Sequence, residues 1–188
     1  MVTKTRSAAP YAFAGILVGA LTPIAFAISA FIDGFWEFDL NTLSDLGISH
    51  SALAANIFNY TCMIAGLFVV IHSIGKIKAY EGAACGGAVV LFFCGILLAA
   101  IGLFTKDTAY HIPIACTYFF LILITVIISA ITDYRSGKVV SAAATGALVV
   151  IVFASMPGFQ LGGIEVIAVL AMCIWMITQS LSLAFSKG

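Results

Sequence analysis

Four side chains in this chain could together carry out chemistry. Ser44 and Asp45 lie in the polar stretch NTLSDLGISH at 41–50, and His111 and Glu165 stand at the edges of two later apolar segments. One imidazole and two carboxylates can bind a divalent metal ion, or can act as an acid–base set around a water molecule. We therefore take Asp45, His111 and Glu165 as candidate catalytic residues and as candidate ligands of one divalent metal ion.

Neighbouring polar residues are candidates for substrate binding. We expect Asn59 and Asn56 to orient a substrate, and Ser44 to cap Asp45 or to hydrogen-bond the substrate. The chain contains neither the HExxH nor the CxxC spacing of common metal sites. A metal site, a metal-free polar pocket and a purely structural network therefore remain open. The structural alternative is real because an aspartate after a serine also favours a turn, and a glutamate near a helix start also suits the helix dipole.

The composition defines the class of protein. Hydrophobic residues make up 63% of the 188 residues and charged residues only 9%, whereas a soluble domain carries about 25% charged residues. The mean hydropathy is +1.18. Such a chain cannot cover its surface with polar groups, so we expect an integral membrane protein whose partner is membrane lipid. The net charge of zero gives no argument for nucleic acid as a partner.

The apolar segments predict one domain, residues 1–188, built as an all-α bundle of six transmembrane helices. A helix needs about 20 mainly apolar residues to cross the hydrocarbon core. The runs are continuously apolar rather than alternating, which argues against a barrel. The six predicted spans are 11–32, 52–74, 83–104, 112–132, 139–156 and 164–185.

The basic residues predict the orientation of the bundle. Seven of the eight lysines and arginines fall on one side of a six-span topology: Lys4, Arg6, Lys76, Lys78, Arg135, Lys138 and Lys187. Only Lys106 falls on the other side. The positive-inside rule makes the first side cytoplasmic. We therefore expect a multi-pass protein of the cell membrane with both termini in the cytoplasm.

This orientation sorts the polar side chains. Asp45, His111 and Glu165 are expected together at the outer mouth of the bundle, where the second, fourth and sixth helices begin. The free N–H groups of those helix starts would stabilise the carboxylates in place of lysines. Asp107 is the expected N-cap of the fourth helix. His72 falls at the opposite end, where we expect it near the lipid headgroups.

The first outer connection is expected to lie at the membrane interface, where aromatic rings are enriched. Its aromatic residues are Phe31, Phe35, Trp36 and Phe38. Asn41 would cap a short helix that stops at Gly47 and lies flat with its leucines toward the lipid.

A GxxxG pattern at Gly15 and Gly19 predicts close helix packing, either within the chain or in a homo-oligomer. The cysteines all fall within predicted spans, where they are expected to be small apolar fillers.

Several motifs resemble a prokaryotic six-span membrane family known as domain of unknown function 998. They are NTLSDLG, then NIFNY and IAGLF in the second span, AIGLF before the fourth, and GGIEVIA opening the sixth. The resemblance covers nearly the whole chain. It marks Ser44, Asp45, Gly47, Phe58, Asn59, Gly102, Phe104, His111 and Glu165, and it leaves out His50 and Asp107. The family implies no established activity.

At the level of the fold, the bundle is also similar to the alkaline ceramidase-like membrane hydrolases. Those bind zinc through three histidines, and this chain offers at most two on the relevant side. The function we expect first is an outer-leaflet site that binds, and hydrolyses or transfers, a lipid headgroup. A non-enzymatic scaffold or assembly factor is the alternative. A small transporter is disfavoured because the middles of the spans hold almost no charge.

Overall fold

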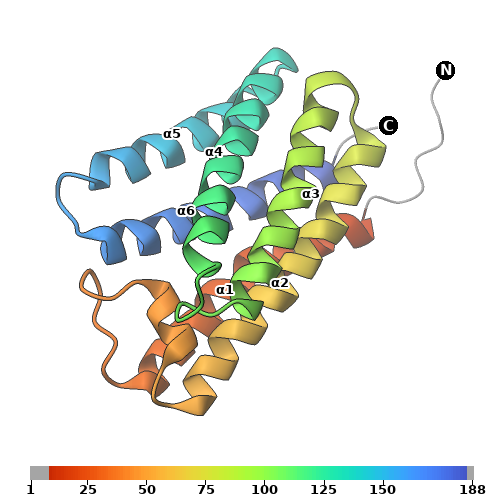
Figure 1. The fold of residues 1–188 in the computed structure, drawn as a ribbon. Helices are drawn as coiled ribbons and strands as arrows, with labels where there is room; N and C mark the ends of the chain where they lie inside the picture. The colour runs from red at the N-terminus through yellow and green to blue at the C-terminus, as the bar shows by residue number, and fades with distance from the viewer. Residues whose placement is uncertain (1–8, 186–188) are drawn as a thin grey trace.

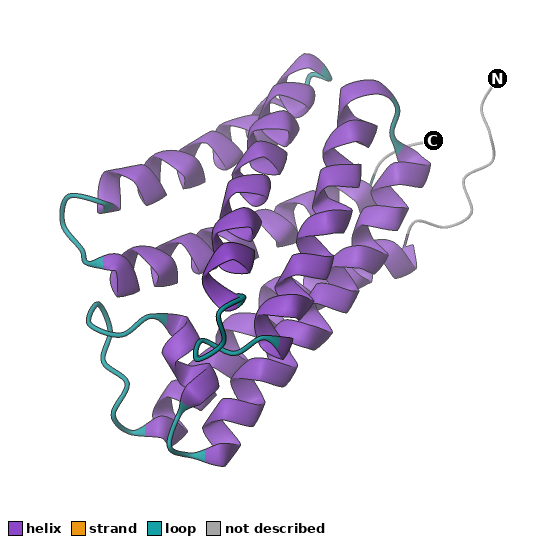
Figure 2. Ribbon diagram, in the orientation of Figure 1, coloured by secondary structure: helices purple, strands orange, loops and turns teal. Residues whose placement is uncertain are grey.

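The computed structural model describes residues 9–185, and Figure 1 shows its helices. In chain order they are α1 (Ala9–Asp33), the short 3-10 helix η1 (Leu43–Ile48), α2 (Ala52–Ala79), α3 (Gly82–Leu103), α4 (His111–Arg135), α5 (Val139–Ser155) and α6 (Leu161–Ala184). Figure 2 shows that the part of the chain drawn in colour contains only helices and loops. The six long helices lie where the six apolar segments predict them.

Length and hydropathy make this a helical membrane protein. Five helices, α1 to α4 and α6, are long and apolar enough to cross a membrane. The fifth predicted span is shorter: α5 has 17 residues, or about 26 Å at 1.5 Å per residue. A typical hydrocarbon core is about 30 Å thick.

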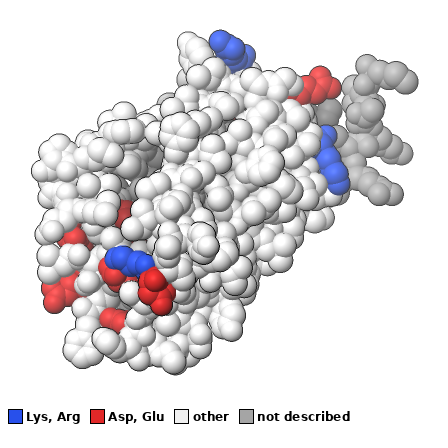
Figure 3. Space-filling view, viewed as in Figure 1, with Lys and Arg blue, Asp and Glu red and all other residues white. Residues whose placement is uncertain are grey.

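The outer surface of the bundle is apolar. Large side chains such as Phe93, Phe120 and Val150 point outward and are exposed. Figure 3 shows charged side chains at the two ends of the molecule and a broad uncharged band between them on the face drawn. Such a band suits a bilayer, where the helices satisfy their own backbone hydrogen bonds.

The helices pack through small residues. α2 lies against α1 and α3, α1 against α6, and α3 against α4, while α5 connects α4 to α6. A Cβ added at Gly66 of α2 would lie 2.5 Å from the carbonyl oxygen of Gly95 in α3. The two backbones therefore approach more closely than any larger residue would allow.

The GxxxG glycines serve packing inside the chain. Gly15 faces the side chains of Ser180 and His72, and a Cβ at Gly19 would lie 2.5 Å from the carbonyl oxygen of Cys173. This face of α1 is buried against α2 and α6. The predicted homo-oligomer contact through Gly15 and Gly19 is therefore not available, because the chain itself already covers both glycines.

Three connections meet at one end of the bundle, which we call the loop end: residues 34–51, 104–110 and 156–160 (Figure 1). The backbone N–H of Gln160 donates to Asp39 Oδ1 at 2.6 Å, and Lys106 Nζ donates to Thr42 Oγ1 at 2.9 Å. The first, third and fifth connections are thus joined by hydrogen bonds. The three connections therefore lie at the same end of the bundle, as the alternation of the predicted helices requires.

The opposite end, which we call the basic end, holds Lys76, Lys78, Arg135 and Lys138 at the ends of α2, α4 and α5. Lys4, Arg6 and Lys187, which also support the predicted orientation, lie outside the described residues.

Candidate functional site

The helix η1 brings the polar stretch into the bundle. Its N-cap is Thr42, whereas Asn41, the expected cap, accepts the N–H of Glu37 at 2.9 Å. Leu43 and Leu46 are both buried in the core, and Leu46 is fully covered. The expectation that this helix lies flat with its leucines in lipid is therefore wrong, because the leucines pack between the long helices instead.

The aromatic residues of the first connection divide into two groups. Phe31 and Phe35 are strongly exposed, as an interfacial role requires. Trp36 is half-buried and its Nε1–H donates to the carbonyl oxygen of Thr42 at 2.9 Å, and Phe38 packs edge-on against Phe159. The second pair therefore holds the connection onto the bundle.

Asn59 holds η1 against α2. Its Nδ2 donates to the carbonyl oxygen of Gly47 at 2.9 Å, and a Cβ at Gly47 would lie 2.6 Å from Asn59 Oδ1. The expected role in orienting a substrate is not supported, because Asn59 points at the backbone of η1. Asn56 lies on an exposed face of the same helix, so it does not join the site either.

Asp45 is paired with a lysine, contrary to expectation. Lys106 Nζ lies 2.5 Å from Asp45 Oδ1, and Asp45 Oδ2 accepts the N–H and the hydroxyl of Thr42 at 2.8 and 2.9 Å. Burial raises the pKa of Asp45, but the hydrogen bonds from Lys106 and Thr42 outweigh it and leave this pKa below its ordinary value. Thr42, rather than Ser44, is therefore the residue that caps Asp45.

His111 is the first residue of α4 and is only 4% exposed. Its Nδ1 lies 2.7 Å from the carbonyl oxygen of Phe104. Since a carbonyl oxygen can only accept, Nδ1 carries the proton, and in the neutral ring Nε2 is an acceptor. The N-cap of α4 is Tyr110. Asp107, the expected cap, is exposed and accepts the hydroxyl of Thr105.

Glu165 lies one turn inside α6, which begins at Leu161. Its Oε2 accepts the backbone N–H of Leu43 at 2.8 Å, so the carboxylate ties α6 to the start of η1. Within residues 9–185, the hydrogen bonds found for these two residues use Glu165 Oε2 and His111 Nδ1 and leave Glu165 Oε1 and His111 Nε2 unengaged.

A cavity of about 650 Å³ lies between α4, α5 and α6, within the size range of small-molecule sites. Its wall is apolar and includes Phe119, Leu148, Val152, Met172 and Trp175. Its polar residues are Thr42, Ser44, Lys106, His111 and Glu165. These five residues form what we call the polar mouth, since all of them come from the loop end.

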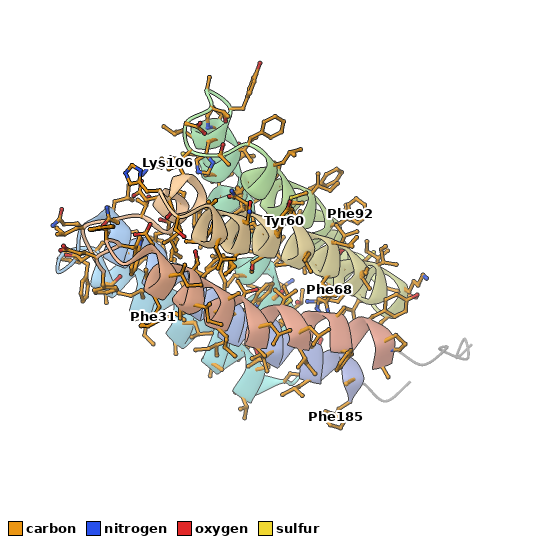
Figure 4. The ribbon with its side chains drawn as sticks, turned by 90° about the horizontal axis from the view of Figure 1, so that it is seen from below. Phe31, Tyr60, Phe68, Phe92, Lys106 and Phe185 are labelled. Carbon is orange, nitrogen blue, oxygen red and sulfur yellow. The ribbon has the colours of Figure 1, made fainter. Side chains whose placement is uncertain are left out.

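A smaller hollow of about 70 Å³ lies within the bundle and shares Ser44, His111 and Glu165 with the large cavity. Trp175, ten residues along α6 from Glu165, lies about 15 Å deeper by helical rise. Figure 4 shows Lys106 at the end of the molecule opposite to Phe185.

The structure therefore brings together only part of the predicted site. Ser44, His111 and Glu165 line one cavity, whereas Asp45 does not line it and His50 is exposed. Sequence reasoning missed Thr42 and Lys106. One feature of the sequence could have predicted the pairing of Lys106 with Asp45. Lys106 is the single basic residue on its side of the predicted topology, and a half-buried carboxylate is stabilised by a nearby positive charge.

The metal interpretation gains no support from this geometry. In the described part of the chain, no group of three or more His, Cys, Asp or Glu side chains could hold a metal ion. Asp45 is already engaged by Lys106 and Thr42, and His111 Nδ1 by a carbonyl oxygen. A lysine ammonium beside the carboxylate would also repel a divalent cation.

A second polar network, also missed from the sequence, lies at the basic end. Lys76 is only 4% exposed, and its Nζ donates to Gln179 Oε1 at 2.7 Å. Gln179 Nε2 in turn donates to Asp133 Oδ2 at 3.0 Å, and Ser141 Oγ donates to the same oxygen at 2.7 Å. The network joins α2, α6, α4 and α5, so buried polar groups close the bundle below the cavity.

His72 lies beside this network and differs from expectation. It is fully buried, and its Nδ1 lies 3.1 Å from the carbonyl oxygen of Tyr11. The expected position near the lipid headgroups is wrong, because the contact between α1 and α2 encloses the ring.

Comparison with known proteins identifies the family but not an activity. No curated protein and no solved structure matches the chain. A family model described as "Protein of unknown function (DUF998)" matches residues 16–182, a segment that contains the whole polar mouth. Because the match covers most of the chain, the protein belongs to this DUF998 family.

Proposed function

We propose that the cavity between α4, α5 and α6 binds one membrane lipid. The acyl chains would lie against the apolar wall, and the headgroup would lie at the polar mouth. The observation that carries this proposal is the shape of the cavity: about 650 Å³ of mainly apolar space whose charged, hydroxyl and imidazole side chains all come from one end. A water-soluble substrate would leave that apolar wall without a partner.

The arrangement of the helices supports entry from the bilayer. α4 packs mainly against α3 and α5, and α6 packs mainly against α1 and α5. α4 and α6 are thus bridged by the short α5 instead of packing tightly on each other. A lipid could reach the cavity sideways without crossing the polar mouth.

The leaflet follows from the charge distribution. The loop end carries the single basic residue Lys106, and the basic end carries Lys76, Lys78, Arg135 and Lys138. If the basic end faces the cytoplasm, the polar mouth lies at the outer leaflet.

Hydrolysis of the bound lipid is a second candidate function, supported by one specific observation. The hydrogen bonds found in the described chain use Glu165 Oε2 and His111 Nδ1 and leave Glu165 Oε1 and His111 Nε2 available, and both residues line the cavity. A carboxylate and a neutral imidazole of this kind can take a proton from water and return it to a leaving group. Turnover that disappears in both Glu165→Gln and His111→Asn would support this function.

Lipid retention tests the first proposal directly. We expect the protein, purified in a mild detergent, to retain about one lipid per chain by native mass spectrometry. Ala168→Phe fills the cavity wall on α6 and should remove most of that lipid. Leu170→Phe adds a comparable ring on an exposed position of the same helix, outside the cavity, and should retain it.

Two outcomes would contradict lipid binding. One is a wild-type protein without stoichiometric lipid, which would favour the scaffold alternative. The other is equal retention by Ala168→Phe and Leu170→Phe, which would place the retained lipid on the outer surface of the bundle.

A further inference from the structure

The polar mouth offers hydrogen-bond acceptors that have no donor. The hydrogen bonds found within the described residues engage Glu165 through Oε2 and His111 through Nδ1, and they leave Glu165 Oε1 and His111 Nε2 available to a ligand. A carboxylate oxygen only accepts, and so does the unprotonated nitrogen of a neutral imidazole. A ligand group that fits here must therefore donate several hydrogen bonds.

The charges at the mouth favour a cation. Lys106 faces Asp45, and this is the only ion pair found within residues 9–185. The charge of Lys106 is thus largely compensated by Asp45, while the carboxylate of Glu165 has no basic side chain in contact with it. As a carboxylate, Glu165 would leave the mouth with an excess negative charge, which attracts a positively charged group.

Lys106 also retains a donor for an anion. Its ammonium has three N–H bonds, of which Thr42 Oγ1 and Asp45 Oδ1 accept two. The side chain is 33% exposed and lines the cavity, so the third N–H is accessible. The hydroxyl of Ser44 also lines the cavity, but its single proton goes to Thr42 Oγ1 at 3.0 Å, because the hydroxyl of Thr42 already donates to Asp45.

Building on the proposed lipid-binding function, we propose that the headgroup is a phosphate ester carrying a primary ammonium, as in an ethanolamine phospholipid. The ammonium lies against Glu165 and His111 and donates its N–H bonds to their free acceptors. The phosphate lies against Lys106 and accepts its third N–H. A choline headgroup has the same charge but no N–H to donate, and a glycerol headgroup lacks the positive charge.

Competition among lipids with identical acyl chains tests this assignment. Wild-type protein would be incubated with an equimolar mixture of ethanolamine, choline and glycerol phospholipids, and the retained lipid would be measured by native mass spectrometry. We expect about tenfold enrichment of the ethanolamine lipid, equivalent to about 1.4 kcal/mol, because only this headgroup combines a positive charge with N–H donors.

An N-methylation series separates charge from hydrogen bonding without altering the protein. Monomethyl-, dimethyl- and trimethylethanolamine phospholipids keep the positive charge and lose one N–H at each step. Retention should fall with each methyl group. Equal retention across the series would overturn the assignment of the ammonium to Glu165 and His111.

Matched variants test whether Glu165 produces the preference for ethanolamine lipid. Glu165→Gln should reduce the enrichment of ethanolamine over glycerol lipid to less than about threefold while some lipid is still retained. Asp107→Asn removes an exposed carboxylate at the same end, outside the cavity, and should leave the enrichment unchanged. A wild-type preference that survives Glu165→Gln intact would contradict the proposal.

The remaining outcomes separate this inference from the proposed function. Equal retention of all three lipids by the wild type would overturn the headgroup assignment but leave lipid binding standing, whereas no retained lipid would overturn both. Glycerophosphoethanolamine, which has the headgroup but no acyl chains, should not compete at equal concentration. If it did, the ligand would be a water-soluble phosphate ester rather than a lipid.

Discussion

Asp45 joins the first and third connections of the loop end through one carboxylate. Oδ2 accepts the N–H and hydroxyl of Thr42, and Oδ1 faces Lys106 Nζ. Because Lys106 lines the cavity and Asp45 does not, Asp45 fixes the position of the ammonium without reaching a ligand. We therefore treat Asp45 as a positioning residue for Lys106.

The lowered pKa of Asp45 leads to a pH-dependent contribution to stability. A carboxylate whose pKa is lower in the folded protein stabilises it above the unfolded value, about 3.9, and this contribution is lost as the pH falls through the folded value. We expect Asp45→Asn to lower the free energy of unfolding at pH 7 by about 1 to 3 kcal/mol. The difference from wild type should shrink below about pH 4.

Thermal melting in detergent between pH 7 and pH 3 measures this effect. Asp107→Asn serves as the control, because Asp107 is exposed and contacts only Thr105 among the described residues. A stability difference for Asp45→Asn that stayed constant down to pH 3 would contradict the assigned role.

At the scale of the helices, the packing of α2 against α3 requires direct contact between their backbones. A Cβ at Gly95 would lie 2.8 Å from the carbonyl oxygen of Gly66 and 2.9 Å from the backbone nitrogen of Val70. Backbone atoms cannot move aside as a side chain can, so the helices would have to separate. This pair of helices also carries Asn59, which anchors η1 beneath the polar mouth.

A pair of glycine variants in α3 tests this dependence. We expect Gly95→Ala to destabilise the protein by about 1 to 3 kcal/mol through overpacking. A Cβ at Gly86 meets open space, so Gly86→Ala should be neutral, or stabilising by up to about 1 kcal/mol through its better helix propensity. Melting temperatures of the two variants, measured side by side, provide the comparison. Equal effects would show that α2 and α3 are not packed this closely.

The short helix α5 shapes the cavity. Leu148, Val149 and Val152 form part of its wall, and α5 is the helix that lies against both α4 and α6. With 17 residues, α5 is shorter than both of these neighbours, which have 25 and 24 residues.

At the scale of the whole molecule, the basic residues determine the expected orientation. Connections 136–138 and 156–160 lie at opposite ends of α5. If α5 crosses the membrane with its basic end inside, Gly158→Cys should react with an impermeant maleimide in intact cells. Ser136→Cys should react only after permeabilisation. Both positions are exposed.

The measurement requires a background in which the five native cysteines are replaced. That background without an added cysteine is the control for nonspecific labelling. Reaction of both positions from the same side would show that α5 does not cross the membrane. Reaction of Ser136→Cys alone in intact cells would reverse the orientation.

The sequence by itself determined the class of the protein, the places of the six long helices and the end at which Asp45, His111 and Glu165 lie. Those properties depend on local quantities. The length and hydropathy of each apolar run give the class and the helix positions, and the number of helices between two connections gives the end at which each connection lies. The start of η1 was harder to predict, because Asn41 and Thr42 are both acceptable caps and only long-range contacts distinguish them.

Only the tertiary structure decided which atoms meet. In a membrane helix the lipid-facing and buried faces are both apolar, so hydropathy does not reveal how each helix is rotated about its axis. That rotation turned Asn56 outward, aimed Asn59 at Gly47 and left Glu165 facing the cavity. The partner of Asp45 lies 61 residues away, a separation that no local pattern records.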